Sequence, residues 1–302
     1  MMDDLYEEIR RRIDGVVRRN EPMAKHTSFG IGGPVDIWVE PEHLRDLFVL
    51  TDICKERRVA CLVVGRGSNL LVGDGGIRGV VINLNQACNR LERKKEAVIA
   101  GAGVSLLALA KFALHHGLQG LEFCVGIPGS VGGALATNAG AWGSSIADVV
   151  QSVLVYDPGN KEKKWLEKES IKFDYRRSNI AARGIVLEAE FHLRLANPDE
   201  ISTRMNHYIS QRTKSQPLQA RSAGSIFKNP PGQYAGAIIE RLGLKGRKCG
   251  GAAVSEKHAN FIVNTGNASA ADVLNLINEI KRRAQTEMQV ELEEEITTLG
   301  EA

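Results

Sequence analysis

One stretch decides the fold of this chain: Gly126-Ile127-Pro128-Gly129-Ser130-Val131-Gly132-Gly133-Ala134-Leu135-Ala136-Thr137-Asn138-Ala139-Gly140-Ala141-Trp142-Gly143. It contains six glycines, with alanines and a serine between them. A flexible linker is also rich in glycine, but linkers do not carry isoleucine, valine, leucine and tryptophan at this density. Because glycine has no Cβ, its backbone can approach another group closely. The stretch therefore predicts a backbone surface on which a large, flat ligand lies.

A second glycine-rich segment follows a short apolar run. Residues 60–64 are apolar and β-branched, as expected of a buried strand, and they lead into Gly65-Arg66-Gly67-Ser68-Asn69-Leu70. Glycines after a strand let successive backbone amides converge on a phosphate. The segment has neither the Gly-Lys-Ser/Thr of a Walker loop nor the spacing of a dinucleotide fingerprint that opens a helix. On its own it is also compatible with tight β-turns.

A polar cluster lies in the last third of the chain, Ser222-Ala223-Gly224-Ser225-Ile226-Phe227-Lys228-Asn229-Pro230-Pro231-Gly232. Buried polar groups are unfavourable unless they are hydrogen-bonded, so the cluster is either a solvated turn or an organised site. The small residues before Ser225 leave room for a ligand. Polar turns are common, and the segment alone does not exclude one.

Two further segments carry charge. In Tyr175-Arg176-Arg177-Ser178 an arginine beside an aromatic ring could hold a carboxylate through two parallel hydrogen bonds, or could be an exposed loop arginine. Near the C-terminus, residues 290–296 alternate apolar and acidic side chains, which predicts a strand. Most of its glutamates should face solvent, with one pointing into a cleft.

The composition is that of a globular protein. Of 302 residues, 43% are hydrophobic and 25% are charged, which allows two or three domains with a sizeable core. A net charge of +3 is too weak to argue for nucleic acid or an anionic membrane, although an anionic small molecule is compatible. No run approaches the roughly 20 apolar residues of a membrane span. Five scattered cysteines without metal-ligand spacing predict reduced thiols in or near the core of a cytoplasmic protein, and no metal site.

Hydrophobic periodicity predicts the main elements. Leu5, Ile9, Ile13 and Val16 fall on one face of an amphipathic helix over residues 3–19. Ser269-Ala270-Ala271-Asp272 resembles a capping box, with an acid one carbon short, at the start of another helix. The remaining expected helices are 104–116, 201–215 and 233–242, and the remaining expected strands are 149–156, 184–195 and 261–264.

With these segments in order, the sequence resembles the UDP-N-acetylenolpyruvoylglucosamine reductases, flavoenzymes that make UDP-N-acetylmuramate for peptidoglycan. The resemblance runs from about Lys25 to Gly300. Any one of its motifs is weak, but five in this order are specific. The motifs are Gly65–Asn69, Gly126–Gly133 with Asn138-Ala139-Gly140, Tyr175–Ser178, Gly224–Pro230 and Leu292–Ile296.

The resemblance implies an α+β fold, with a two-part FAD-binding module of the vanillyl-alcohol-oxidase (PCMH) type and a C-terminal α+β substrate-binding domain. We expect FAD-binding subdomains at residues 1–85 and 86–205 and the substrate-binding domain at residues 206–302, its last strand returning toward the flavin. The implied cofactors are non-covalent FAD and NADPH, and the implied substrate is UDP-N-acetylglucosamine enolpyruvate. No nucleic acid, membrane or oligomer is required.

The resemblance also assigns residues. Ser225 matches the proton donor, Arg176 the arginine that polarises the substrate carboxylate, and Glu295 the acid that assists enolate stabilisation. Tyr175, Lys228 and Asn229 are expected at the substrate. The residues expected to bind the cofactor are Gly65, Arg66, Gly67, Ser68, Asn69, Leu70, Gly126, Pro128, Gly129, Ser130, Gly132, Gly133, Asn138 and Gly140.

Some assignments stay open at this point. The usual Leu-Glu-Pro-Glu-Val of the family reads Leu-Glu-Glu-Glu-Ile here, so that the choice of Glu295 over Glu294 depends on register. Period-two alternation places Glu293 and Glu295 on one face and does not separate them. Arg177 beside Arg176, and Ser222 near Ser225, leave similar choices. The chain also resembles the shorter subclass of the family, which lacks an inserted tyrosine-bearing loop.

Two other functions compete with the reductase. Another flavoenzyme of the same module, an oxidase of small alcohols, would show covalent flavin or oxygen reactivity and would not explain Ser225, Arg176 and Glu295 together. A non-catalytic UDP-sugar-binding protein would be colourless. All three catalytic positions carry competent residue types, which favours the reductase.

Overall fold

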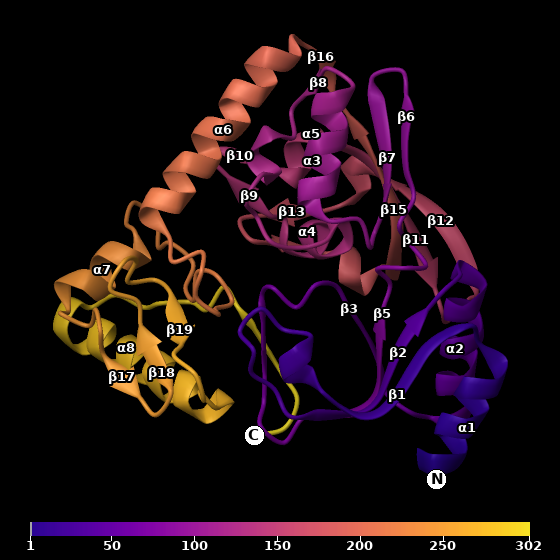
Figure 1. The fold of residues 1–302 in the computed structure, drawn as a ribbon, viewed down its shortest axis with the longest axis horizontal. Helices are drawn as coiled ribbons and strands as arrows, with labels where there is room; N and C mark the ends of the chain where they lie inside the picture. Colours follow the sequence, from indigo (N-terminus) through magenta and orange to yellow (C-terminus); the bar gives the residue numbers. More distant parts are fainter. Residues whose placement is uncertain (1) are drawn as a thin grey trace. The chain divides into compact units, whose positions relative to one another are not determined.

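The computed structural model describes residues 2–302, and the chain forms two compact units (Figure 1). The first unit comprises Met1–Arg19, Ile37–Arg66 and Gly79–Gln211. The second comprises Asn20–Asp36, Gly67–Arg78 and Arg212–Ala302. Each unit is therefore assembled from segments that are far apart in the sequence.

The first sheet has the strand order β1-β2-β5-β3, and β3 runs parallel to β5. Its strands are β1 (Gly15–Pro22), β2 (Pro34–Pro41), β3 (Cys61–Val64) and β5 (Ile77–Asn83). The unit boundary falls inside β1, β2 and β5. Two helices, α1 (Met2–Arg12) and α2 (Leu44–Arg57), bury Leu5, Ile9 and Leu47 in one core with Ile37 and Val80 of this sheet.

The prediction of one helix over residues 3–19 is wrong beyond Arg12, where α1 ends. Gly15 has a φ of +122°, and a Cβ there would lie 2.2 Å from the Glu40 carbonyl oxygen. Only glycine fits this position, and glycine is a poor residue for continuing a helix. The chain therefore turns and continues as β1, and Val16 is 38% exposed.

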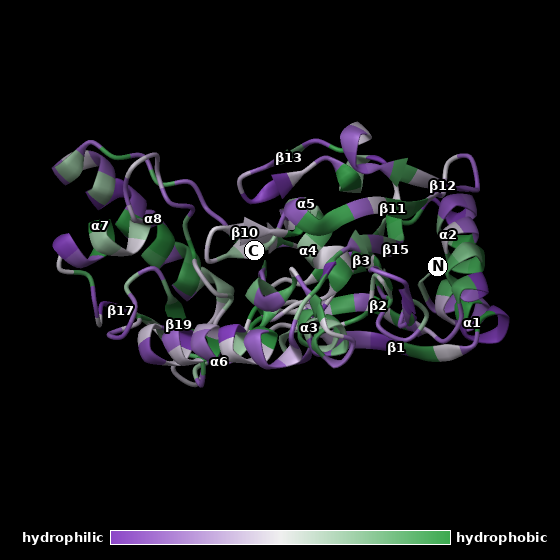
Figure 2. Cartoon of the chain, turned by 90° about the horizontal axis from the view of Figure 1, so that it is seen from above, coloured by the Kyte–Doolittle hydropathy of each residue, from purple (hydrophilic) through white to green (hydrophobic). Residues whose placement is uncertain are grey.

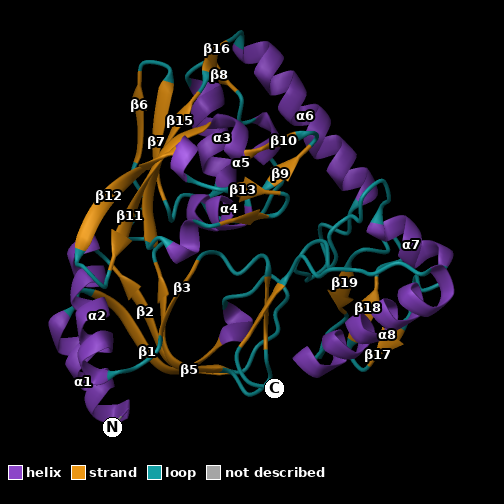
Figure 3. Ribbon diagram, turned by 180° about the vertical axis from the view of Figure 1, so that it is seen from behind, coloured by secondary structure: helices purple, strands orange, loops and turns teal. Residues whose placement is uncertain are grey.

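The second sheet is antiparallel throughout, with the order β12-β11-β15-β7-β6 (Figure 3). Apolar residues lie along β11 and β15, as Figure 2 shows in green, and alternate residues of these strands are buried in a second core. The predicted strands 149–156 and 184–195 and the predicted helix 104–116 are confirmed, with small shifts at their ends. The elements are β6 (Leu91–Lys94), β7 (Ala97–Gly101), α3 (Leu106–His115), β11 (Val150–Asp157), β12 (Glu162–Glu167), β15 (Ile185–His192) and β16 (Arg194–Leu195).

Short elements and one long helix complete this unit. The short elements are β8 (Leu118–Gln119), α4 (Val131–Thr137), β9 (Gly140–Ala141), β10 (Ser144–Ser145), α5 (Ile146–Val149), β13 (Phe173–Asp174), β14 (Arg177–Ser178), and the 3₁₀ helices η2 (Glu122–Cys124), η3 (Lys168–Ser170) and η4 (Ile180–Ala182). The long helix is α6 (Pro198–Ser215), whose last residues belong to the second unit.

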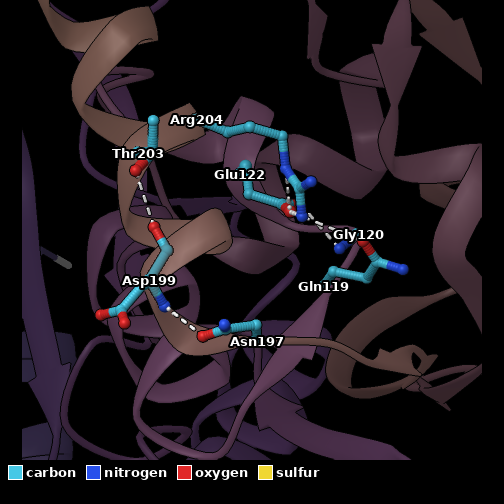
Figure 4. A network of polar contacts seen from close by, with 7 residues as sticks. All are labelled: Gln119, Gly120, Glu122, Asn197, Asp199, Thr203 and Arg204. Atoms are coloured by element: carbon cyan, nitrogen blue, oxygen red, sulfur yellow. Dashed lines mark hydrogen bonds and ion pairs between the residues drawn. The ribbon is translucent and has the colours of Figure 1, made fainter.

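Arg204 of α6 forms hydrogen bonds to Gln119 and Glu122 of the first unit (Figure 4). Its Nε and Nη2 donate to Glu122 Oε1 at 3.0 and 2.8 Å, and Nη2 also donates to Gln119 Oε1 at 2.9 Å. Glu122 is buried, and its Oε2 accepts from the Gly120 amide at 2.7 Å. Because a buried carboxylate needs hydrogen-bond donors, this contact links α6 to η2.

We expect Arg204→Met to lower the free energy of unfolding by about 1 to 3 kcal/mol, because it leaves the buried Glu122 carboxylate without its charged donor. The effect should lie toward the lower end, since the Arg204 side chain is 39% exposed and partly screened. The measurement is denaturant unfolding. Adding Glu122→Gln to Arg204→Met should recover part of the loss, and purely additive effects would contradict the contact.

The second unit has its own core, formed mainly by residues after 220, with Phe29, Ile31 and Leu71 from the N-terminal part of the chain. Ser269 and Asp272 form the predicted capping box at the start of α8, and the amides of Ser269 and Gly251 hold the pKa of Asp272 below its ordinary value. Its elements are η1 (Met23–Lys25), β4 (Leu70–Val72), α7 (Ala235–Arg241), β17 (Lys248–Cys249), β18 (Ala252–Val254), β19 (Ile262–Asn264), α8 (Ala270–Met288) and β20 (Thr297–Leu299).

The predicted strand over residues 290–296 is largely wrong. Only Glu294 forms a bridge in this stretch, opposite Phe227, and the regular strand β20 begins at Thr297 and runs parallel to β4. The alternation is real, since Leu292 and Ile296 are buried. It arises from a single extended segment with interrupted pairing.

None of the five cysteines, all within residues 2–302, forms a disulfide. Cys54, Cys88 and Cys124 are buried as predicted, Cys249 is half-buried, and Cys61 is exposed, contrary to expectation. Burial raises the pKa of the Cys88 thiol to about 12, so this thiol stays protonated at neutral pH.

Residues 2–302 form three hydrophobic cores, two in the first unit and one in the second. The division into domains at residues 85 and 205 stays a prediction. Within residues 2–302, no helix combines the length and the apolar character needed to cross a membrane. Over the same residues, no cluster of three or more His, Cys, Asp or Glu side chains could hold a metal ion.

Candidate functional site

In the first unit, the two glycine-rich segments lie against each other. A Cβ on Gly65 would lie 2.4 Å from Ser130 Oγ, so only glycine fits there without displacing the hydroxyl. The Gly65 carbonyl accepts a hydrogen bond from Asn83 Nδ2 at 2.8 Å. Ser130 is the N-cap of α4 and accepts from the Gly133 amide at 3.4 Å. Residues far apart in the sequence thus form one glycine-lined surface.

At some of these positions, close packing against other residues explains why the residue is glycine. A Cβ on Gly132 would lie 3.1 Å from Ala102 Cβ, and the Gly132 amide donates to the Ala102 carbonyl at 2.9 Å. Gly133 differs, because it is exposed and a Cβ there would meet only Ser130 Oγ, at 3.5 Å. Gly126 and Gly129 have φ angles of +78° and +151°, which other residues rarely adopt. The surface around Gly133 is therefore open to a ligand, as a cofactor cradle requires.

We expect Gly65→Ala to lower both the free energy of unfolding, by about 1 to 3 kcal/mol, and the flavin content of the purified protein, because the new methyl group collides with Ser130 Oγ. Ser130→Ala should lower the free energy of unfolding by about 1 kcal/mol, because the N-cap of α4 is lost. The double variant should be less destabilised than the sum of the two, since Ser130 Cβ lies at an ordinary 3.6 Å. Strict additivity would show that the collision is not the cause.

A hairpin presents Tyr175 and Arg176 between β13 and β14. Asn138, predicted to bind the cofactor, is buried, and its Nδ2 donates to the Asp174 carbonyl at 3.0 Å. Its Oδ1 accepts from the Ala147 amide at 3.1 Å. The Asn138 side chain therefore holds the hairpin in place through one donated and one accepted hydrogen bond.

Arg176 and Arg177 differ in conformation. Arg176 has a φ of +57°, is half-buried, and places its guanidinium 5.3 Å from the centre of the Tyr175 ring. Arg177 is exposed and lies in regular strand β14. A left-handed conformation at a residue other than glycine is unfavourable and is often found at functional sites. The geometry favours Arg176 over Arg177 as the ligand-binding arginine.

In the second unit, Gly67–Leu70 continue the first glycine-rich loop. Gly67 has a φ of +63°, and a Cβ there would lie 2.0 Å from the His26 carbonyl oxygen. Asn69 Nδ2 donates to the Glu295 carbonyl at 3.0 Å, and the Asn69 carbonyl accepts from the Thr297 amide at 2.9 Å. The loop is thus joined to the acidic C-terminal segment, a connection that the sequence did not predict.

The serine cluster is an extended segment, not a solvated turn. Ser225 forms a bridge with Phe261, and Phe227 forms a bridge with Glu294. Ser225 itself is half-buried, and the Gly224 before it has a φ of +79° with open space where a Cβ would lie. The predicted room beside Ser225 is therefore present in the structure.

The three glutamates of the C-terminal segment have different surroundings. Glu293 is exposed and forms an ion pair with Lys228. Glu294 forms an ion pair with Lys281 of α8 at 2.9 Å. Glu295 is half-buried, and its amide donates to the Ile226 carbonyl at 2.7 Å. Glu293 and Glu294 thus form ion pairs with lysines, and the choice of Glu295 as the functional acid stays a prediction.

The predicted residues are divided between the units. Gly65, Arg66, the residues of 126–140, Tyr175 and Arg176 belong to the first unit. Gly67–Leu70, Ser225, Lys228, Asn229 and Glu295 belong to the second. Asn229 Oδ1 accepts from the Ala235 amide at 3.0 Å and so fixes the start of α7. Sequence reasoning missed Asn83 and Asn260, since an isolated asparagine carries no pattern.

Two family descriptions match the chain. The FAD binding domain matches residues 35–163. The C-terminal domain of UDP-N-acetylenolpyruvoylglucosamine reductase matches residues 216–299.

Curated relatives match over almost the whole length. The UDP-N-acetylenolpyruvoylglucosamine reductase of Listeria welshimeri is 44% identical over 286 residues, 94% of this chain and 96% of its own. The enzyme of the same name from Bacillus subtilis is 42% identical over 302 residues, 99% of each chain. The crystal structure of the Thermus caldophilus UDP-N-acetylenolpyruvylglucosamine reductase is 36% identical, has a TM-score of 0.83, and covers 94% of this chain and 99% of that one.

Proposed function

Because this chain belongs to the UDP-N-acetylenolpyruvoylglucosamine reductase family, we propose that Ser225, Arg176 and Glu295 carry the reduction of UDP-N-acetylglucosamine enolpyruvate. The protein is an FAD-dependent oxidoreductase that acts in peptidoglycan synthesis. Its fold is the predicted α+β arrangement of a two-part FAD-binding module and a C-terminal substrate-binding part. The observation that carries the residue assignment is the pairing of the Ser225 segment with the Glu295 segment.

The residues present fit an FAD molecule. The exposed Gly133 and the left-handed Gly126 and Gly129 give backbone that a flat ring system and a pyrophosphate can approach. Bound to these residues, FAD would supply the redox chemistry of the reaction, the passage of a hydride from NADPH to C3 of the enolpyruvyl group. The residues that would hold it are the glycine-rich segments Gly65–Leu70 and Gly126–Gly140, with Asn138 acting through the hairpin that it positions.

Ser225 is proposed to give the proton that C2 of the substrate must receive. Serine is a weak acid, so it needs surroundings that stabilise its transient alkoxide. Lys228 belongs to the same segment, and its ammonium, which forms an ion pair with Glu293, is proposed to contribute to that stabilisation. Asn229 and Tyr175 are proposed to contact substrate.

Arg176 and Glu295 are proposed to stabilise the charge that develops on the enolate and the carboxylate. A guanidinium matches a carboxylate through two parallel hydrogen bonds. A carboxylic acid can donate a hydrogen bond to an enolate oxygen only while it is protonated, which requires a raised pKa when the substrate is bound. The open and pre-formed backbone at Gly224 leaves space for that substrate.

The substrate and the location also belong to this proposal. The enolpyruvyl sugar nucleotide and NADPH are its small-molecule partners, and the site requires no nucleic acid, membrane or second copy of the chain. A cytoplasmic location agrees with cysteines that form no disulfide within residues 2–302.

The first test is an absorption spectrum of the purified protein under anaerobic conditions. We expect bands of oxidised flavin that bleach when NADPH is added and return when the enolpyruvyl sugar nucleotide is added. A colourless protein that cannot be reconstituted with FAD would remove the proposal and leave a sugar-nucleotide-binding protein.

A further inference from the structure

Asn260 is a buried polar residue that no motif of the sequence singles out. It lies two residues before β19, and only 4% of its surface is exposed. A buried side-chain amide is unfavourable unless both its donor and its acceptor are hydrogen-bonded. The partners of Asn260 therefore show what the residue does.

The backbone amide of Asn260 donates to His258 Nδ1 at 3.3 Å, while its carbonyl and its side-chain amide bind two successive residues of the serine segment. The Asn260 carbonyl accepts from the Ile226 amide at 2.8 Å. Its side-chain Oδ1 accepts from the Phe227 amide at 3.0 Å, and its Nδ2 donates to the Phe227 carbonyl at 2.8 Å. Because the Phe227 amide can only donate and its carbonyl can only accept, these contacts fix the orientation of the Asn260 amide.

The Asn260 side chain thus takes the place of a neighbouring strand. The bridge to Phe261 ends at Ser225, so that the next residues have no regular strand on this edge. On the other edge, the Ile226 carbonyl accepts from the Glu295 amide at 2.7 Å, and the Lys228 amide donates to the Glu293 carbonyl at 2.8 Å. Asn260 and the acidic segment therefore hold residues 226–228 from both edges.

We propose that Asn260 is the positioning residue that sets Ser225 and Glu295 for proton transfer, through its three hydrogen bonds to Ile226 and Phe227. Ser225 directly precedes this pair of residues, and Glu295 is bonded to Ile226. A shift of the 226–227 backbone therefore moves both groups. The inference rests on the proposed function, and it adds a buried residue that acts through the backbone of Ile226 and Phe227.

The test compares Asn260→Asp with Asn260→Leu in the flavin-loaded protein. Aspartate keeps an acceptor for the Phe227 amide, but when ionised it turns a carboxylate oxygen toward the Phe227 carbonyl. Burial and this repulsion raise the pKa of the new carboxyl. Once it is protonated at lower pH, its O–H can donate to Phe227 and restore both bonds.

We expect both variants to keep a normal rate of flavin reduction by NADPH. At pH 8 the reoxidation by the enolpyruvyl sugar nucleotide should fall about 10²-fold, because misplacing a reacting group by an ångström has an effect of that order. Lowering the pH should restore the Asn260→Asp variant, relative to the unmodified protein, and should not restore Asn260→Leu. Hydrogen exchange of the Phe227 amide should change in parallel, slow in Asn260→Asp at low pH and fast in Asn260→Leu at every pH.

The leucine variant also controls for other titrating groups. The titratable groups on the surrounding elements are His258, whose pKa burial lowers, Lys245 and Glu240, which act on His258, and Lys228, Glu293, Glu294 and Glu295 on the adjoining segments. All are present in both variants, so that a pH dependence seen only in Asn260→Asp belongs to residue 260.

Asn264 supplies a matched control for the loss of a buried asparagine. Its Nδ2 donates to the Phe29 carbonyl at 3.1 Å and its Oδ1 accepts from the Gly266 amide at 2.9 Å, away from residues 226–227. Asn264→Asp should lower stability without the pH-dependent loss of sugar reduction. Normal sugar reduction in Asn260→Leu, or an equal loss in Asn264→Asp, would overturn the inference. Ser225→Ala in the same assay distinguishes a failure of the Asn260 proposal from a failure of the proposed function. Full activity of Ser225→Ala would contradict the proposed function itself.

Discussion

Replacing Ser225 with alanine is expected to leave the reduction of the flavin by NADPH near its normal rate and to slow the reduction of the sugar substrate by about 10²- to 10⁴-fold, the usual contribution of a positioned acid. The physical reason is that only the second half-reaction needs a proton at C2. Ser225 is half-buried in an extended segment beside open space at Gly224, so the hydroxyl has both a fixed backbone and room for substrate.

Anaerobic stopped-flow absorbance measures the two half-reactions separately. Ser222→Ala is the matched control, since Ser222 lies in the same segment and its carbonyl accepts from Ser28 Oγ at 2.7 Å, a contact that the substitution leaves intact. We expect this control to behave like the unmodified protein. Equal damage to both half-reactions in Ser225→Ala would exclude Ser225 as the proton donor.

Replacing Glu295 with glutamine is expected to lower the rate of sugar reduction by about 10²-fold, because an amide is a weaker hydrogen-bond donor than a carboxylic acid and stabilises the developing enolate charge less well. The same substitution at Glu294 should change the rate little, since it removes only a partly exposed ion pair with Lys281. Glu293→Gln removes the ion pair with Lys228 and should have an intermediate effect.

The ranking of the three variants in steady-state turnover is the measurement. A larger effect at Glu294 than at Glu295 would place the functional acid one residue earlier. A large effect at Glu293 alone would assign the role to the Lys228 ion pair. Effects of residues that act together need not add, so each variant is compared with the unmodified protein and not with a sum.

The glycine-rich segments could be recognised from the sequence because they break the ordinary composition of folded chains. The strands and helices with strong hydrophobic periodicity can also be predicted from the sequence, because their pattern is local in the chain. The capping box at Ser269 is a local pattern of the same kind. The helix predicted over residues 3–19 is too long. The hydrophobic periodicity continues past Gly15, but the φ of +122° at this glycine is incompatible with a helix. The acidic segment was also misjudged, because an alternating pattern predicts which residues face inward but not whether a partner strand lies beside them.

The sequence by itself therefore determined the family, the FAD requirement and the candidate catalytic residues, because these depend on motifs that are local in the chain. Only the tertiary structure showed that Glu293 and Glu294 form ion pairs with Lys228 and Lys281 and that Arg176 has a left-handed backbone, since neither feature can be read from the spacing of residues. It also showed that Asn260, 33 residues from Phe227, holds the serine segment. The physical reason is that a buried polar group is stabilised by whichever partner the fold brings within hydrogen-bond distance, and that distance is fixed by packing.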